Sequence, residues 1–475
     1  MTREPPSPEA EPGALGELKK TLLLAAPIMA GHVGQMLMGL VDTLMIGQVG
    51  VAELAASALA NNLFHIFMVF GLGLLTSVSV VVANAYGSQE KKAAGEALRH
   101  GLQLAFLSGL LVAAAGSFLF PLLSLMGQEP EVVEKGKPYL VFLLLSLPFI
   151  FVQMAGKNFS ESVSSPWPAF WTSLIAIGAN VFLNWVFIFG NLGAPAMGLT
   201  GAGLATLLAR IMGLLLLFLW LRYDPFFRPW LPDKWLLPFD FPALWHLFRL
   251  GFPMALQILF EVLIFSVTAI VIGVLGVVPL AAHQIAITCA ATTFMFPLGL
   301  GMALTIRVSQ TAGARQWQRL QTICRTTFLF TIAQALVFAL GYILFRDTIA
   351  GFFTTSPEVA TLAAQLLFLA ACFQIVDGLQ TTAMGALRGL RDMKIPTLLT
   401  FGAYWVISFP LGVYLGFFTP LGARGFWIAF CVGLGLVAIS LLLRLRQTTA
   451  SFPGPIDKSL SRGSMKPQGN GEKAP

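Results

Sequence analysis

The chain has 475 residues, of which 56% are apolar and only 11% are charged. Soluble globular domains carry about 25% charged residues, so this composition excludes a soluble protein of this length. The formal net charge is +7, and most Lys and Arg residues lie between apolar segments. We interpret this charge as a membrane-topology signal and expect no nucleic-acid partner.

Apolar stretches recur along nearly the whole chain, each with about 20 residues, the length of a membrane-spanning helix. They predict an all-α membrane protein with twelve spans near residues 21–46, 54–84, 98–126, 138–156, 168–190, 198–221, 247–273, 279–306, 322–345, 362–387, 396–417 and 424–443. Disordered tails are expected at residues 1–17 and 446–475, the second of which is rich in Ser, Gly, Pro and Lys.

The distribution of Lys and Arg predicts that both termini are cytoplasmic. With this orientation the outer loops hold only Lys135, Lys137, Arg346 and Arg424. The other basic residues, including Arg388, fall in inner segments. The exception is Arg210 in the sixth span, which we interpret as a structural partner or as a side chain that extends to the membrane surface.

The second half of the chain repeats the first. When residues 18–87 are shifted by 226 positions, proline and glycine residues coincide without a gap, and Gln35 coincides with Glu261. We therefore predict an N-lobe (residues 18–230) and a C-lobe (residues 231–445) of six helices each. Because six is even, both lobes enter the membrane from the same side, and an axis along the membrane normal relates them across a central cavity. This is the architecture of alternating access.

Three carboxylates, Asp42, Glu261 and Asp377, lie within the spans, in LVDTLMI, LFEVLIF and QIVDGLQ. An ionised acid at the membrane centre costs about 2.5–3.5 kcal/mol, so its retention favours a cation or proton pathway. The alternative is that each is a neutral, hydrogen-bonded acid that fixes helix packing.

In the C-lobe, polar residues at helical spacing share faces with two of these acids. Glu261 would lie about 21 Å from the inner end of its helix and Asp377 about 22 Å from the outer end of its own, so both reach mid-membrane. Their oxygen atoms predict a site for Na⁺ or H⁺. The polar neighbours on the seventh, eighth and tenth spans are Gln257 and Thr268, Gln284, Thr288 and Thr292, and Gln374 and Thr381.

In the N-lobe, Asp42 would lie only about 6 Å from the outer end of its helix, so it is the least buried of the three acids. Asn180 and Asn184, one turn apart, could hydrogen-bond Asp42 or coordinate an ion, or they could simply join helices. The other polar candidates on these helices are Gln35, Asn61 and His65.

The segments VDTLMIGQVG, LAAHQIAITCAATTFMFPLGLGMALTIRVSQTAGA and GALRGLRDMKIP resemble the multidrug and toxic compound extrusion (MATE) family, and the Glu261 and Asp377 pair is similar to its NorM branch. The resemblance covers residues 18–445. It implies a multidrug efflux antiporter of the bacterial plasma membrane that expels organic cations and amphiphiles in exchange for Na⁺ or H⁺. Glu261 and Asp377 would bind the cation, and Asp42 would be the N-lobe acid beside Asn180 and Asn184. A related branch has a second acid where this chain has Asn184.

We also expect a monomer that is not an enzyme and has no cofactor. A flippase for lipid-linked oligosaccharides or peptidoglycan precursors is the alternative of similar architecture, but it would need basic residues in the cavity to hold a pyrophosphate. The sequence has no metalloprotease H-E-x-x-H motif and no P-loop, which argues against an intramembrane enzyme. The two-lobed repeat favours a carrier over a channel.

Overall fold

The computed structural model describes residues 13–118, 129–235 and 238–450. Within them, twelve segments are long and apolar enough to span a membrane, as the sequence predicts. The N-terminal half contains α1 (Ala14–Gly47), α2 (Val51–Gly87), α3 (Lys91–Ser117), α5 (Pro130–Leu145), α6 (Leu147–Ser162), α7 (Trp167–Phe189) and α8 (Gly198–Tyr223). The C-terminal half contains α9 (Phe241–Val274), α10 (Val277–Gly313), α11 (Trp317–Phe353), α12 (Pro357–Gly389), α13 (Lys394–Phe401), α14 (Phe409–Phe417) and α15 (Ala423–Ala450).

Two spans are built from more than one helical segment. α5 and α6 together form the fourth span, and Pro148, which has no backbone N–H to donate, stands in the first turn of α6. In the eleventh span a π-helix, Gly402–Ser408, joins α13 to α14. A π-helix changes the direction in which the following side chains point, and such segments occur frequently at functional sites.

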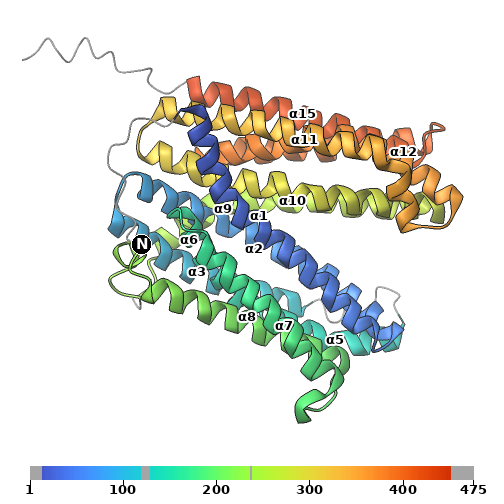
Figure 1. Ribbon diagram of the computed structural model, residues 1–475, viewed down its shortest axis with the longest axis horizontal. Coiled ribbons are helices and arrows are strands. Elements are labelled where there is room, and N and C mark those ends of the chain that lie inside the picture. Colours follow the sequence, from blue (N-terminus) through green and yellow to red (C-terminus); the bar gives the residue numbers. More distant parts are fainter. Residues whose placement is uncertain (1–12, 119–128, 236–237, 451–475) are drawn as a thin grey trace, which may run out of the picture.

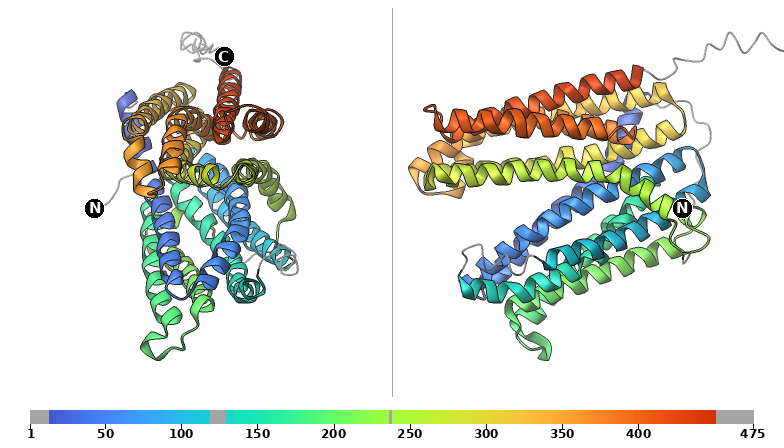
Figure 2. Two further views of the ribbon diagram at one scale, coloured as in Figure 1. Left: turned by 90° about the vertical axis from the view of Figure 1, so that its right-hand side faces the viewer. Right: turned by 180° about the vertical axis from the view of Figure 1, so that it is seen from behind.

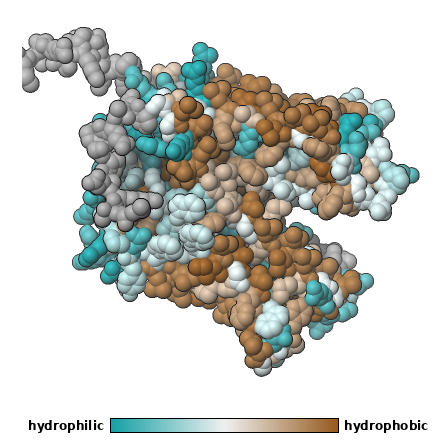
Figure 3. Space-filling view, viewed as in Figure 1, coloured by the Kyte–Doolittle hydropathy of each residue, from teal (hydrophilic) through white to brown (hydrophobic). Residues whose placement is uncertain are grey.

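Helices α1–α8 form the N-lobe and α9–α15 form the C-lobe, seen as the blue-green and yellow-red halves of Figures 1 and 2. Each lobe has its own apolar core, which includes Leu140 and Phe151 in the N-lobe and Trp427 and Phe430 in the C-lobe. Large apolar side chains remain exposed along the outer faces of the helices, where lipid would cover them (Figure 3). The predicted two-lobed all-α fold is confirmed.

The helical ends differ from the predicted boundaries in two places. α1 begins at Ala14, and Glu17, which was expected in a disordered tail, is 1% exposed. α15 continues to Ala450, so residues 446–450 are helical as well. The rest of both predicted tails, residues 1–12 and 451–475, lies outside the described residues.

The contacts between the lobes follow the sequence repeat. Gly87 of α2 lies against the backbone of Gln310, and Gly313 of α10 lies against the backbone of Asn84. Residues 84 and 87 are the repeat partners of residues 310 and 313, so the two contacts are reciprocal. A second reciprocal pair joins Gly73 to Ala255 and Gly299 to Met29. Such exchanged contacts are those of a two-fold axis between the lobes.

Gly87 and Gly313 are the last residues of α2 and α10, so their contacts lie at the end of the molecule where α1 begins and α15 ends, which we term the closed end (Figure 1). There, Gln310 of the C-lobe donates hydrogen bonds to the Ser162 carbonyl (2.7 Å) and to the Ser164 hydroxyl (2.9 Å) of the N-lobe. The connection after the fourth span thus takes part in closing this end. Towards the opposite end, the open end, the lobes separate around a hollow (Figure 3).

A buried ion pair also joins the lobes at the closed end. The Glu17 carboxylate of α1 accepts hydrogen bonds from Arg307 Nη2 of α10 and from Arg319 Nε of α11 (2.8 Å). Arg307 Nη1 also donates to the Glu17 carbonyl (2.7 Å). The first turn of α1 is therefore fixed to two helices of the other lobe.

Candidate cation-binding site

In the C-lobe, Glu261 of α9 is half-buried and is held by a chain of hydrogen bonds. Gln380 Nε2 of α12 donates to Glu261 Oε1 (3.2 Å), and the Tyr404 hydroxyl donates to Gln380 Oε1 (2.6 Å). Gln380 and Tyr404 are each 1% exposed. Because Tyr404 occupies the carbonyl of Gln380, the Gln380 amide must present its N–H group to the carboxylate. Three different spans thus position one acid.

Asp377 lies one turn before Gln380 on α12 and is 3% exposed. The structure gives its carboxylate no hydrogen-bond partner among the described residues. Because Gln380 donates to Glu261 and stands one turn from Asp377, α9 and α12 bring the two carboxylates into the same part of the lobe. Two carboxylates and the Tyr404 hydroxyl therefore gather in the interior of the C-lobe. This donor set contains only oxygen atoms, which suits a hard cation such as Na⁺, and a shared proton would serve the same need.

A positive charge stands beside these acids. Arg388, near the end of α12, donates from Nη2 to Gln257 Oε1 of α9 (2.6 Å), and Gln257 lies one turn before Glu261. The charge pattern of the sequence puts Arg388 in an inner segment, but its guanidinium reaches into the lobe as far as Gln257, one turn from Glu261. Its flexible aliphatic arm makes this possible.

In the N-lobe, the predicted neighbours of Asp42 are in contact with it. Asn184 Nδ2 donates to Asp42 Oδ1 (2.6 Å) and also lies 3.2 Å from Asn180 Oδ1. Asn180 Nδ2 in turn donates to the Thr206 hydroxyl of α8 (3.3 Å). Both asparagines are fully buried. This network joins α1, α7 and α8, so it can hold a charge on Asp42 and also fix the packing of the lobe.

Arg210, the intramembrane cation of the sixth span, lies in the same lobe. Its Nη1 donates to the Ser146 hydroxyl, and its guanidinium stacks 4.6 Å from the centre of the Phe64 ring. It is also near enough to attract Asp42. Arg210 is therefore a structural partner of the N-lobe rather than a side chain that extends to the membrane surface.

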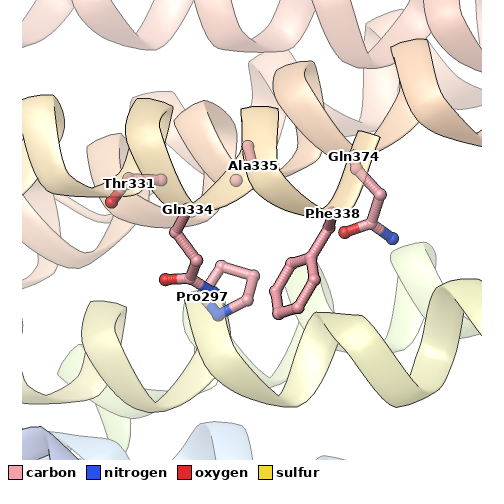
Figure 4. A pocket seen from close by; sticks show the side chains of 7 residues that line it. Pro297, Thr331, Gln334, Ala335, Phe338 and Gln374 are labelled. Atoms are coloured by element: carbon pink, nitrogen blue, oxygen red, sulfur yellow. The ribbon is translucent and has the colours of Figure 1, made fainter. Parts of the chain in front are cut away.

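Other predicted site residues do not contact the acids. Gln35 and Gln284 are exposed, and Thr288 donates to the Gln284 carbonyl of its own helix (2.7 Å). Gln374 donates to the Ala290 carbonyl of α10 (3.2 Å). It lines a small depression between α10, α11 and α12, where Gln334 and Phe338 point towards Pro297 (Figure 4). Thr381 lies against Gly301 of α10.

Three residues that the sequence pattern did not indicate belong to the site, namely Gln380, Tyr404 and Arg388. Gln380 is three positions after Asp377, so helical spacing could have placed it beside that acid. Tyr404 carried a weaker signal, since it is a tyrosine inside an apolar span. Nothing in the local pattern linked Arg388 to Glu261.

Comparison with known proteins agrees with this architecture. The MatE family model matches residues 27–186 and 253–414, one segment in each lobe. The chain belongs to the MATE family. The multidrug resistance protein NorM of Photobacterium profundum is 36% identical over 438 residues, which cover 90% of this chain and 95% of that protein. NorM of Aliivibrio fischeri is 35% identical over 437 residues, which cover 90% and 94%.

A solved structure of a eukaryotic MATE transporter, AtDTX14, has a TM-score of 0.83 with 20% identity and covers 92% of this chain and 98% of its own. This MATE protein is thus a multi-pass membrane protein of the NorM group of multidrug transporters, and the predicted family is confirmed. The family consists of transporters, and a multidrug transporter carries small molecules across a membrane.

Proposed function

We propose that this MATE protein is an antiporter that exports organic cations and other amphiphiles in exchange for Na⁺ or H⁺ by alternating access. The observation that carries the proposal is the pair of C-lobe carboxylates, half-buried Glu261 and buried Asp377, which are linked through Gln380, the donor to Glu261 one turn after Asp377. Two acids in a low-dielectric interior repel each other, so the pair needs a bound cation or a shared proton.

Exchange of substrate for ion follows because either one can neutralise the carboxylate pair. A cationic substrate neutralises the same charge as the coupling ion, so occupancy by one disfavours occupancy by the other. We favour Na⁺ as the coupling ion, chiefly because the Glu261 and Asp377 pair is similar to the arrangement of the NorM branch. The name of the two relatives, multidrug resistance protein NorM, agrees with a broad range of exported compounds.

The difference between the two ends of the molecule, one closed and one open, supports alternating access. One end is closed by reciprocal contacts between the lobes, and a hollow enters at the other (Figure 3). We propose a location in the bacterial inner membrane with both termini cytoplasmic, since Lys and Arg are concentrated on that side. The closed end would then face the cytoplasm, and the molecule would be open to the outside.

The test is release of a bound fluorescent organic monocation from purified protein on addition of Na⁺ or acid. Glu261→Gln and Asp377→Asn keep the shape of the side chains but remove the charge, so each should abolish ion-triggered release in a folded protein. Asp347→Asn is the matched control, because Asp347 is an exposed carboxylate near the open end. If both C-lobe variants still release dye as the wild type does, the coupling site lies elsewhere.

The flippase alternative predicts a different result. A flippase would bind a polyprenyl pyrophosphate and would show no ion-triggered release of a cationic dye. The C-lobe charges do not favour a pyrophosphate, because two acids, Glu261 and Asp377, outnumber the single arginine, Arg388, and would repel it. Similarity to the NorM proteins also supports the antiporter.

A further inference from the structure

Each lobe holds one arginine beside its acids, but the balance of charge differs between the lobes. In the N-lobe, Arg210 stands near a single acid, Asp42. In the C-lobe, Arg388 is bonded to Gln257, one helical turn from Glu261. A second acid, Asp377, lies one turn before Gln380, which donates to Glu261. If all these groups are ionised, the N-lobe group is neutral and the C-lobe group keeps one negative charge. The remaining charge sets how many monovalent cations each group needs for neutrality: none in the N-lobe and one in the C-lobe.

The position of Arg388 is fixed by the structure. Its Nη2 atom lies 2.6 Å from Gln257 Oε1, and Gln257 is 2% exposed. Gln257 precedes Glu261 by one helical turn, a rise of about 6 Å. Among the described residues no ion pair joins Arg388 to Glu261, so the hydrogen bond to Gln257 holds the guanidinium away from the carboxylate.

The guanidinium is also short of partners. Arg388 Nε is buried and has no hydrogen-bond partner among the described residues. A buried charge with an unused donor is costly unless opposite charge lies nearby. Glu261, one turn beyond Gln257, supplies that charge without direct contact. Arg388 is therefore placed to act on the acids by its charge rather than as a ligand.

We propose that Arg388 is a resident counter-charge that limits the C-lobe site to one monovalent cation at a time. The inference rests on the proposed function and adds a preference for a class of substrate. A monovalent ion or a monocationic compound restores neutrality, so the two exchange one for one. A dication adds a surplus positive charge beside Arg388 and is disfavoured.

The experiment compares two probes that share one ring system, ethidium, a monocation, and propidium, a dication. Wild-type protein should bind ethidium more tightly. Arg388→Gln should reverse the preference, because two negative charges then remain. At a separation of about one helical turn, loss of the arginine charge should raise Na⁺ affinity about tenfold or more, which calorimetry measures directly. Arg388→Lys keeps the charge and should retain the preference for ethidium.

Gln257→Leu provides a second test with the opposite sign. It removes the acceptor that holds Arg388, so the guanidinium can move onto Glu261 and compete with the ion. Na⁺ affinity should therefore fall, whereas Arg388→Gln raises it, and general damage to the fold would not produce opposite effects. Arg346→Gln, which removes a half-exposed arginine near the open end, is the matched control and should change neither quantity.

The outcomes separate this inference from the proposed function. If Arg388→Gln leaves Na⁺ affinity and dye preference unchanged while Glu261→Gln abolishes Na⁺ binding, the counter-charge is refuted and the antiporter stands. If Glu261→Gln and Asp377→Asn bind Na⁺ as the wild type does, the proposed site itself is refuted. Should Arg388→Gln fail to fold, an unchanged or raised Na⁺ affinity in Gln257→Leu is enough to overturn the inference.

Discussion

Asp42 and Glu261 stand on corresponding helices of the two lobes, but their surroundings differ. The Asp42 carboxylate accepts a hydrogen bond from Asn184 (2.6 Å) and has Arg210 as its only nearby counter-charge among the described residues. Glu261 shares its lobe with a second acid, Asp377. A neutral amide in place of the Asp42 carboxylate could still accept from Asn184 through its oxygen, so the hydrogen-bond network can survive loss of the charge.

We therefore expect Asp42→Asn to impair the transport of different dyes to different extents, whereas changes at the C-lobe acids should impair the transport of all of them. Ion-triggered dye release should persist, while the efflux rates of different dyes should change by different factors. The measurement is efflux of several cationic dyes from vesicles with imposed Na⁺ and pH gradients, with Glu261→Gln and Asp377→Asn assayed in parallel. Equal and total loss of transport in all three variants would contradict this ranking.

At the level of single residues, the sequence predicted which side chains share a helical face, but not which residues of the neighbouring helices each face contacts. Asn180, Asn184 and Asp42 are in contact as expected, because small amides on adjacent helices reach one another. Gln374 shares a face with Asp377 but bonds instead to the α10 backbone. Arg388 reaches Gln257 across a distance in sequence that no local pattern could indicate. Packing between helices decides these partners.

Among the helices, α1 has a distinctive position because its first turn is fixed to the opposite lobe. Glu17 is 1% exposed and bonds Arg307 and Arg319 of the C-lobe. For the molecule to open at the closed end, this ion pair must break or move. Removing one partner of a buried ion pair costs about 3 kcal/mol, because the other charges remain buried without compensation.

Glu17→Gln should therefore favour conformations that are open at this end. Spin labels at two exposed positions, Lys92 on α3 and Gln318 on α11, can report the distance between the lobes in a background that lacks the native cysteines. The distance distribution should shift towards longer values. Glu358→Gln, an exposed acid in the first turn of α12, is the control. An unchanged distribution in Glu17→Gln would show that the ion pair does not hold the lobes together.

At the level of elements, the twelve spans could be predicted because hydropathy reports burial in lipid. The start of α1 could not, because Glu17, Lys19 and Lys20 lower the hydropathy where the helix extends beyond the apolar core. The π-helix at Gly402–Ser408 was also missed. Hydropathy does not distinguish a π-helix from an α-helix, although this segment carries the tyrosine that orients Gln380.

For the whole molecule, the reciprocal contacts predict symmetric effects of mutation. A Cβ atom at Gly87 would collide with the backbone of Gln310, and one at Gly313 would collide with the backbone of Asn84. Overpacking of this kind costs about 1–3 kcal/mol. Gly87→Ala and Gly313→Ala should each loosen the closed end and lower the melting temperature by similar amounts.

Thermal unfolding of the purified protein and the label distance between Lys92 and Gln318 measure this effect. Gly39→Ala on α1 is the control, because no atom lies within 4 Å of the added Cβ. A large change in only one of the two variants would show that the contacts, although reciprocal in position, are not equivalent in energy.

The reciprocal contacts also bear on the origin of the chain. An interface in which residue i of one half meets residue j of the other, and j meets i, has the form of a symmetric homodimer. A six-helix ancestor with this surface could have paired with a second copy before duplication joined the two genes. In such a dimer every mutation appears twice. Fusion released the halves from that constraint, so that one can carry glutamine at position 35 and the other an acid at position 261.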